Sequence, residues 1–213
     1  MGKNIFAKVF LWMFIGLLIT FGTSFYVSTQ EFLAWNVLKL GWVWFIIELA
    51  IVIFLAARIT KMSSFTAKLS FALYSFVTGL MLSYIFIIFS LPSILLVFGA
   101  AALMFGVFGL YGYFTKVDLT KISSILAMGL VGIIIVSLIN IFLGNAMVDT
   151  IISIVGIVIF TLFVVYDIQK IKSFSSFSNI PTDNLAIYGA LQLYLDFINI
   201  FLNLLNLFGN SRD

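Results

Sequence analysis

The sequence predicts an all-α integral membrane protein: a bundle of seven transmembrane helices that forms a single domain over residues 1–213, with the C-terminal helix at its centre. Three observations lead to this fold class: an apolar composition, seven apolar stretches of spanning length, and basic residues concentrated in alternate loops. Of the 213 residues, 63% are apolar and 9% are charged, and the mean hydropathy is +1.25. A soluble domain usually carries about 25% charged residues. Lipid is therefore the expected solvent for most of the surface.

The seven spans follow from the length of the apolar stretches. A helix needs roughly 20 apolar residues to cross a hydrocarbon core about 30 Å thick. The chain has seven such stretches, separated by short polar or turn-forming segments. The expected spans are 5–28, 37–57, 69–89, 93–115, 122–143, 148–169 and 185–208. The tryptophans mostly lie near span ends, as in an aromatic belt: Trp12, Trp35, Trp42 and Trp44.

The distribution of basic residues predicts the orientation, because Lys and Arg favour cytoplasmic loops. Nine of the 11 basic residues fall at the N-terminus or in loops on one face, and two fall on the other face. The sequence thus predicts a cytoplasmic N-terminus and an outside C-terminus. Short loops without an organelle signal favour a bacterial plasma membrane. The nine residues are Lys3, Lys8, Arg58, Lys61, Lys68, Lys116, Lys121, Lys170 and Lys172, and the two are Lys39 and Arg212.

The residue types that are missing exclude several kinds of chemistry. The chain has no cysteine and no histidine, which removes disulfides, thiolate chemistry, haem and most zinc sites. We therefore expect no resident cofactor. The formal charge of +3 is spread thinly between apolar stretches, so membrane orientation explains it better than nucleic-acid binding. Any chemistry must use carboxylates, amides or hydroxyls.

Three acids fall inside or at the ends of apolar stretches, where a charge is costly unless it has water or a partner. Glu48 lies about 13 Å from the end of its span, and Asp196 lies about 16 Å into the last span, so both are near mid-membrane. Asp167 lies closer to the cytoplasmic end of span 148–169. Each acid is therefore a candidate functional residue, with a purely structural alternative. Glu48 could be a buried acid that is hydrogen-bonded to a neighbouring helix. Asp167 could be solvated at the helix end or paired with Lys170.

The last span carries a polar stripe: Gln192, Asp196, Asn199, Asn203 and Asn206 are spaced by four, three, four and three residues. At 100° per residue they fall within a sector of about 80°. Such a stripe is expected to face other helices or a hydrated path, which makes the last helix central. The alternative for the asparagines is hydrogen bonding that only holds helices together.

Two segments resemble the signature stretches of the Bax inhibitor family, the transmembrane BAX inhibitor motif group. They are residues 162–171, LFVVYDIQKI, and residues 194–205, YLDFINIFLNLL. The bacterial members of the family include a small calcium leak protein of the plasma membrane. The resemblance extends to length, number of spans and predicted orientation, although its motifs lie in the last two spans.

The resemblance implies a pH-sensitive calcium leak controlled by a pair of aspartates, which match Asp167 and Asp196. It matches the family's glutamate to Glu48, which joins the two aspartates as an expected member of the pH sensor and ion pathway, and the arginine at the cytoplasmic end of the second span to Arg58. Calcium takes oxygen ligands, so Asp167 and Asp196 are the expected metal ligands, with calcium as the transported ion. Two adjacent carboxylates would share a proton and titrate as a unit. Arg58 could pair with Asp167 as a gate latch.

Three other functions are compatible with buried acids in a helical membrane protein. An intramembrane aspartyl protease also places acids on two helices, but this chain lacks Gly-x-Gly-Asp at Asp196 and any proline after Pro181. We therefore expect no enzyme. A proton-coupled carrier of a small solute would use the acids as a proton relay. A regulatory membrane protein acting through protein partners remains the third alternative.

Overall fold

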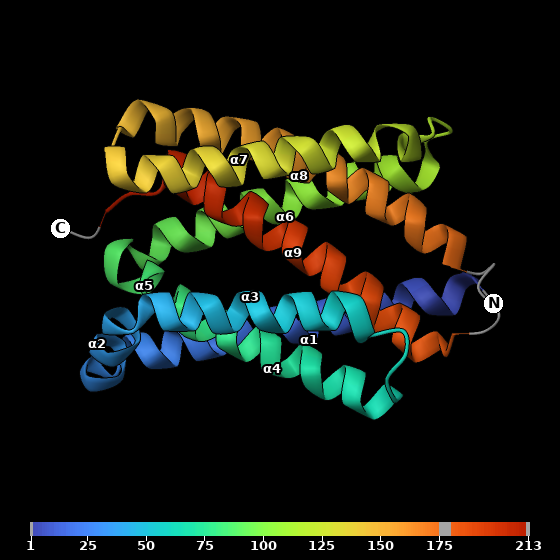
Figure 1. Ribbon diagram of the computed structural model, residues 1–213, viewed down its shortest axis with the longest axis horizontal. Helices are drawn as coiled ribbons and strands as arrows, with labels where there is room; N and C mark the ends of the chain where they lie inside the picture. Colours follow the sequence, from blue (N-terminus) through green and yellow to red (C-terminus); the bar gives the residue numbers. More distant parts are fainter. Residues whose placement is uncertain (1, 175–179, 212–213) are drawn as a thin grey trace. The chain divides into compact units, whose positions relative to one another are not determined.

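The computed structural model describes residues 2–174 and 180–211, with the side chains of all of these except 2–4, 120 and 121. Figure 1 labels the α-helices in chain order. They are α1 (Gly2–Ser28), α2 (Glu31–Lys39), α3 (Gly41–Arg58), α4 (Ser64–Leu82), α5 (Ile85–Ile88), α6 (Leu91–Phe114), α7 (Ser123–Leu143), α8 (Ala146–Ser173) and α9 (Thr182–Phe208), with the 3-10 helix η1 (Leu119–Ile122) before α7.

Seven stretches of the described chain are helical, long and apolar enough to cross a membrane, with mean hydropathies from 1.6 to 2.7. Each overlaps one predicted span, so the all-α membrane fold class and the number of spans are confirmed. The stretches are Ile5–Ser28, Gly41–Arg58, Ser64–Ile88, Leu91–Phe114, Ser123–Leu143, Ala146–Ser173 and Thr182–Phe208.

The predicted start of the second span, at residue 37, is wrong. The backbone leaves helical geometry at Leu40, with φ −100° and ψ 19°, and α3 starts at Gly41. The preceding helix α2 has nine residues, so it is only about 13 Å long and cannot cross a membrane. It buries Ala34 and Val37 against the rest of the protein. The apolar pattern of α2 and α3 is continuous in sequence, which hid the break between them.

The third span begins earlier than the predicted residue 69. The Oγ of Ser63 accepts a hydrogen bond from the backbone N–H of Thr66 at 3.1 Å. This N-cap satisfies one of the free donors of the first turn and fixes the start of α4 at Ser64. Helix α4 ends at Leu82, and the short α5 completes the spanning stretch.

The chain divides into two compact units, the first of which comprises Met1–Leu91, Ser173–Tyr194 and Ser211–Asp213. Within it, α4 lies beside both α1 and α3 (Figure 1). The α1–α4 contact is close because Gly79 has no side chain: a Cβ there would lie 2.8 Å from the carbonyl oxygen of Thr20. The Oγ of Ser24 also donates a hydrogen bond to the Gly79 carbonyl oxygen at 2.8 Å. Small residues thus bring these backbones together.

The second unit comprises Pro92–Lys172 and Leu195–Asn210. Helix α6 contacts α8 at Gly112, where a Cβ would lie 2.9 Å from both the Cα and the carbonyl oxygen of Val165. Helix α6 also contacts α9 through aromatic rings: Phe98 and Phe105 both meet Phe197 edge to face, with ring centroids 5.1 and 5.8 Å apart. These contacts place α6 against both helices that carry the buried aspartates.

Helix α9 is the most enclosed of the seven spans. Of its spanning window, 72% is buried, against 6% to 50% in the other six. It belongs to the first unit up to Tyr194 and to the second from Leu195. This burial agrees with a polar stripe that does not face lipid, and the central position of the C-terminal helix stays a prediction.

The predicted orientation can be tested by cysteine labelling. Cysteines at Ser63 and Asp118 are expected to react with a membrane-impermeant thiol reagent only after the membrane is opened, because the basic loops should face the cytoplasm. The native chain has no cysteine to give background labelling. Ser176, the third test position, lies outside the described residues. A cysteine at Gln30, on the opposite face, should be labelled in intact cells, and labelling of Ser63 or Asp118 there would contradict the orientation.

Candidate functional site

Two buried carboxyl groups meet within the second unit. Asp167 on α8 is 3% exposed and Asp196 on α9 is 4% exposed, and the two side chains are hydrogen-bonded to each other. Asp167 shares its helix face with Val164 and Ile171, and Asp196 shares its face with Ile200, all of which are buried. The apolar pattern of each helix therefore turns its acid inward. The burial of Asp167 contradicts the alternative that it is a solvated helix-end acid.

A hydrogen bond between two carboxyl groups has a requirement on their protonation. Two carboxylates are both acceptors, so a bond between them requires that one oxygen carries hydrogen. Two negative charges in contact inside a low-dielectric protein would also repel strongly. The Oδ2 atom of Asp196 is buried without a hydrogen-bond partner among the described residues.

Glu48 lies on α3, in the first unit. Its Oε1 atom accepts a hydrogen bond from the hydroxyl of Thr78 on α4 at 2.7 Å, and the side chain is half-buried. This arrangement is the structural alternative expected for Glu48, a buried acid satisfied by a neighbouring helix.

Arg58 is the last residue of α3 and is exposed. It belongs to the first unit, whereas Asp167 belongs to the second. The latch between the two therefore stays a prediction.

The polar stripe of α9 makes fewer interhelical hydrogen bonds than its spacing suggested. The Nδ2 of Asn199 donates to the carbonyl oxygen of Leu195 at 2.8 Å, and the Nδ2 of Asn203 donates to the carbonyl oxygen of Asn199 at 2.7 Å. Both amides thus bond to the preceding turn of their own helix. Asn203 also lies against Gly156 of α8, where a Cβ would come within 2.8 Å of its side chain.

The two ends of the stripe differ from its centre. The Nδ2 of Asn206 donates to the Oγ of Ser153 on α8 at 2.7 Å. Asn206 as a whole is exposed, but this bond directs its amide toward another helix, as predicted for the stripe. Gln192, at the other end, is half-buried like Asn199 and Asn203.

The pair of aspartates provides few ligands for a metal ion. Among the described residues, three or more acidic side chains do not converge anywhere. Calcium takes about six to eight oxygen ligands. Asp167 and Asp196 together offer at most four carboxylate oxygens, so water or other oxygens would have to complete the shell. This donor set fits a passing cation better than a tightly held one.

The sequence reasoning missed one charged cluster, at the N-terminal end of α9. The carboxylate of Asp183 accepts hydrogen bonds from the Nζ of Lys8 on α1 and from the Nζ of Lys68 on α4, each at 2.6 Å. The Lys68 Nζ also lies 5.9 Å from the ring centroid of Trp12. The partners are up to 175 residues apart in the chain, so no local spacing could have indicated the cluster. It joins α1 and α4 to the first turn of α9.

Asp183→Asn is expected to lower the free energy of unfolding by about 0.5–2 kcal/mol, because two partly exposed ion pairs are lost. Chemical unfolding in detergent micelles measures the change. The loss should shrink at high salt, which screens exposed charges. Glu31→Gln, at an exposed acid in the first turn of α2, is the matched control and should change stability less. An equal loss at low and high salt would mean that the ion pairs do not stabilise the protein.

Comparison with known proteins gives full-length matches. A family model described as "Inhibitor of apoptosis-promoting Bax1" matches residues 2–213. The chain is 41% identical over 215 residues to the inner membrane protein YbhL of Escherichia coli strain K12, covering 97% of this chain and 91% of that protein. It is 41% identical over 227 residues to an uncharacterized protein of Borreliella burgdorferi, covering 99% and 94%. It is 32% identical over 213 residues to an uncharacterized protein of Deinococcus radiodurans, covering 99% and 92%.

Proposed function

The chain belongs to the Bax inhibitor family, and from this we propose that it is a cation leak channel of a bacterial inner membrane, with calcium as its ion and the Asp167–Asp196 pair as its pH sensor. The family also confirms the resemblance noted in spans 148–169 and 185–208. The inner-membrane location is supported by the relative YbhL, which is named as an inner membrane protein.

The observation that carries the proposal is the buried hydrogen bond between Asp167 and Asp196. Ionisable side chains inside a membrane are costly, and mark ion pathways and proton relays. Two acids on neighbouring helices that only needed to be satisfied would do better as amides. The unpartnered Oδ2 of Asp196 supports the same conclusion, since a buried acceptor needs a proton, a water molecule or a cation.

The choice of calcium rests on the ligand types and on the family resemblance. The chain has neither thiol nor imidazole, so it offers cations only oxygen ligands inside the membrane. Hard cations such as calcium prefer such ligands. The half-buried amides of Asn199 and Asn203 lie on the same face of α9 as Asp196. They extend the polar surface along which a partly hydrated cation would pass.

Protonation of the pair changes both its charge and its contacts. With one proton the pair carries a single negative charge that attracts a cation, and with two protons it is neutral. The second proton would also weaken any pairing between Asp167 and Arg58. The first effect lowers cation flux and the second raises it, so we expect a pH-dependent flux whose sign reports which effect dominates.

Calcium flux through purified protein in liposomes tests the proposal. A calcium-sensitive dye inside the liposomes should report entry faster than in protein-free liposomes, with a rate that changes with external pH. Parallel measurements with sodium and magnesium would report selectivity. Calcium entry no faster than in protein-free liposomes at any pH would refute a leak and would favour a regulatory protein that acts through partners.

A further inference from the structure

We propose that the first unit contains a binding site for a membrane glycerolipid, in which one acyl chain enters a cavity between α1, α2, α3 and α4 and an ester carbonyl oxygen accepts a hydrogen bond from the indole Nε1–H of Trp44. The cavity has a volume of about 500 Å³. This volume is within the range of small-molecule sites, about 300–1,000 Å³. The site is independent of the aspartate pair.

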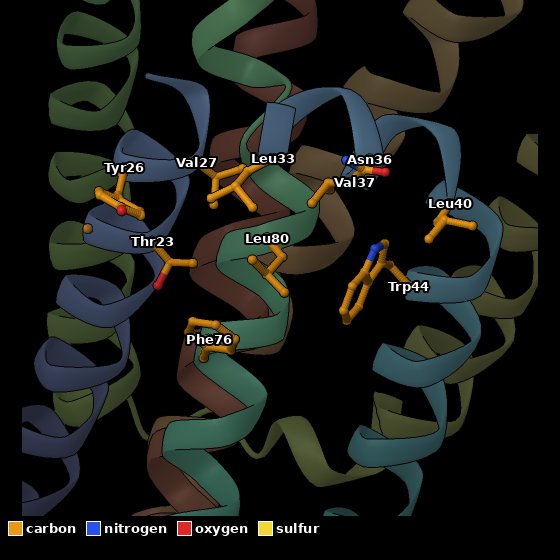
Figure 2. A pocket seen from close by; sticks show the side chains of 11 residues that line it. Thr23, Tyr26, Val27, Leu33, Asn36, Val37, Leu40, Trp44, Phe76 and Leu80 are labelled. Carbon is orange, nitrogen blue, oxygen red and sulfur yellow. The ribbon is translucent and has the colours of Figure 1, made fainter. Parts of the chain in front are cut away.

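The walls of the cavity are almost entirely apolar. Figure 2 shows Val27 from α1, Leu33 and Val37 from α2, and Phe76 and Leu80 from α4 around one space. The described residues that line it include no charged side chain. The lining therefore suits a hydrocarbon chain. It disfavours an ion, a charged headgroup, or a free fatty acid, whose carboxylate would need a cationic partner.

One polar group in the cavity has no partner. The indole of Trp44 extends from α3 into the space that α4 lines (Figure 2). Its Nε1 atom is buried and has no hydrogen-bond partner among the described residues. A buried tryptophan N–H usually has an acceptor. An occupant of this cavity is thus expected to combine an apolar body with an uncharged hydrogen-bond acceptor, as a glycerolipid ester does.

The position of the cavity along the spans fits that chemistry. Trp44 lies three residues after the start of α3 at Gly41, about 4.5 Å along the helix axis. On α1 the lining begins at Gly22 and reaches Val27, one residue before the end of the helix at Ser28. The Trp44 end of the cavity is therefore at the level where hydrocarbon gives way to the polar interface. An acyl ester sits at this level, with its chain directed inward.

Lipid retention by the purified protein tests the site. The protein is extracted in mild detergent, washed extensively, and examined by native mass spectrometry and by chemical analysis of co-purified phospholipid. Wild-type protein should retain phospholipid. Gly22→Phe should abolish retention, because a Cβ at Gly22 meets nothing within 4 Å and a larger side chain there would fill the cavity. Gly99→Phe on α6 is the matched control, since a Cβ at Gly99 also meets nothing within 4 Å, and it should retain lipid.

A second variant tests the hydrogen bond. Trp44→Phe keeps an aromatic wall and removes the N–H donor, so its affinity for added phosphatidylglycerol should fall about threefold to tenfold. Circular dichroism and thermal unfolding would verify that each variant is folded. Equal phospholipid retention by wild-type protein and a folded Gly22→Phe variant would overturn the site, as would unchanged affinity in Trp44→Phe together with wild-type retention. Retention of free fatty acid in place of phospholipid would overturn the proposed ligand class.

Discussion

Replacing both Asp167 and Asp196 by asparagine is expected to remove the pH dependence of calcium flux while leaving the protein folded. Asparagine has nearly the shape of aspartate and still forms hydrogen bonds, but it cannot take up or release a proton in this range. Wild-type flux should change by about threefold per pH unit at the midpoint of its titration and by up to about tenfold per pH unit beyond it, whereas flux through the double variant should change by less than about twofold. The measurement is dye-reported calcium entry into liposomes over a pH series.

The single variants show whether the two acids act as one unit. If Asp167 and Asp196 share a proton, the effects of the two single replacements should not add up to that of the double replacement. Glu48→Gln is the matched control, because Glu48 is a membrane acid of the first unit with its own hydrogen bond to Thr78. It should keep the wild-type pH profile. An unchanged profile in the double aspartate variant would place the sensor elsewhere, with Glu48 the next candidate.

Gly112→Ala should destabilise the protein, although alanine is the better helix former. A Cβ at Gly112 would lie 2.9 Å from the Cα and the carbonyl oxygen of Val165 and 3.3 Å from the Cβ of Ile168. The atoms in the way are mostly backbone, so α6 and α8 would have to move apart. Such overpacking costs about 1–3 kcal/mol. Unfolding of purified protein in detergent by a denaturing surfactant would measure the loss.

Gly106→Ala, on the same helix, is the matched control for that prediction. A Cβ at Gly106 meets nothing within 4 Å, so this replacement should be neutral or should stabilise the protein by up to about 1 kcal/mol through helix propensity. Similar effects from both replacements would show that the α6–α8 approach at Gly112 does not limit stability.

The sequence predicted the membrane fold well because each span is independently marked by its length and hydropathy. It failed where two helices share one apolar stretch: the break at Leu40 between α2 and α3 has no proline or long polar segment to reveal it. The start of α4 was hidden for a different reason. The helix begins after the N-cap residue Ser63, and hydropathy alone does not detect an N-cap.

The sequence predicted which residues belong to the candidate site, but it predicted fewer of the contacts that these residues make. Asp167 and Asp196 stood out because ionisable residues are rare inside apolar spans. Helical periodicity correctly grouped Asn199 and Asn203 on one face of α9, yet it could not show that their amides bond to their own backbone. Two other features depend on residues that are far apart in the sequence, so no local pattern could predict them. They are the ion pairs of Asp183 and the buried Trp44 Nε1 atom without a hydrogen-bond partner among the described residues.

The bonding of Asn199 and Asn203 to their own helix has a mechanical consequence for α8 and α9. Where Asn203 meets Gly156, the two helices are in close contact, while the Asn203 amide donates its hydrogen bond to its own helix. Two hydrogen bonds described above join the helices at points far apart: Asp167 with Asp196, and Ser153 with Asn206. If the aspartates share a proton as proposed, its loss would break the first hydrogen bond and leave the second, so the helix pair would then be joined by a side-chain hydrogen bond at one of these two points only.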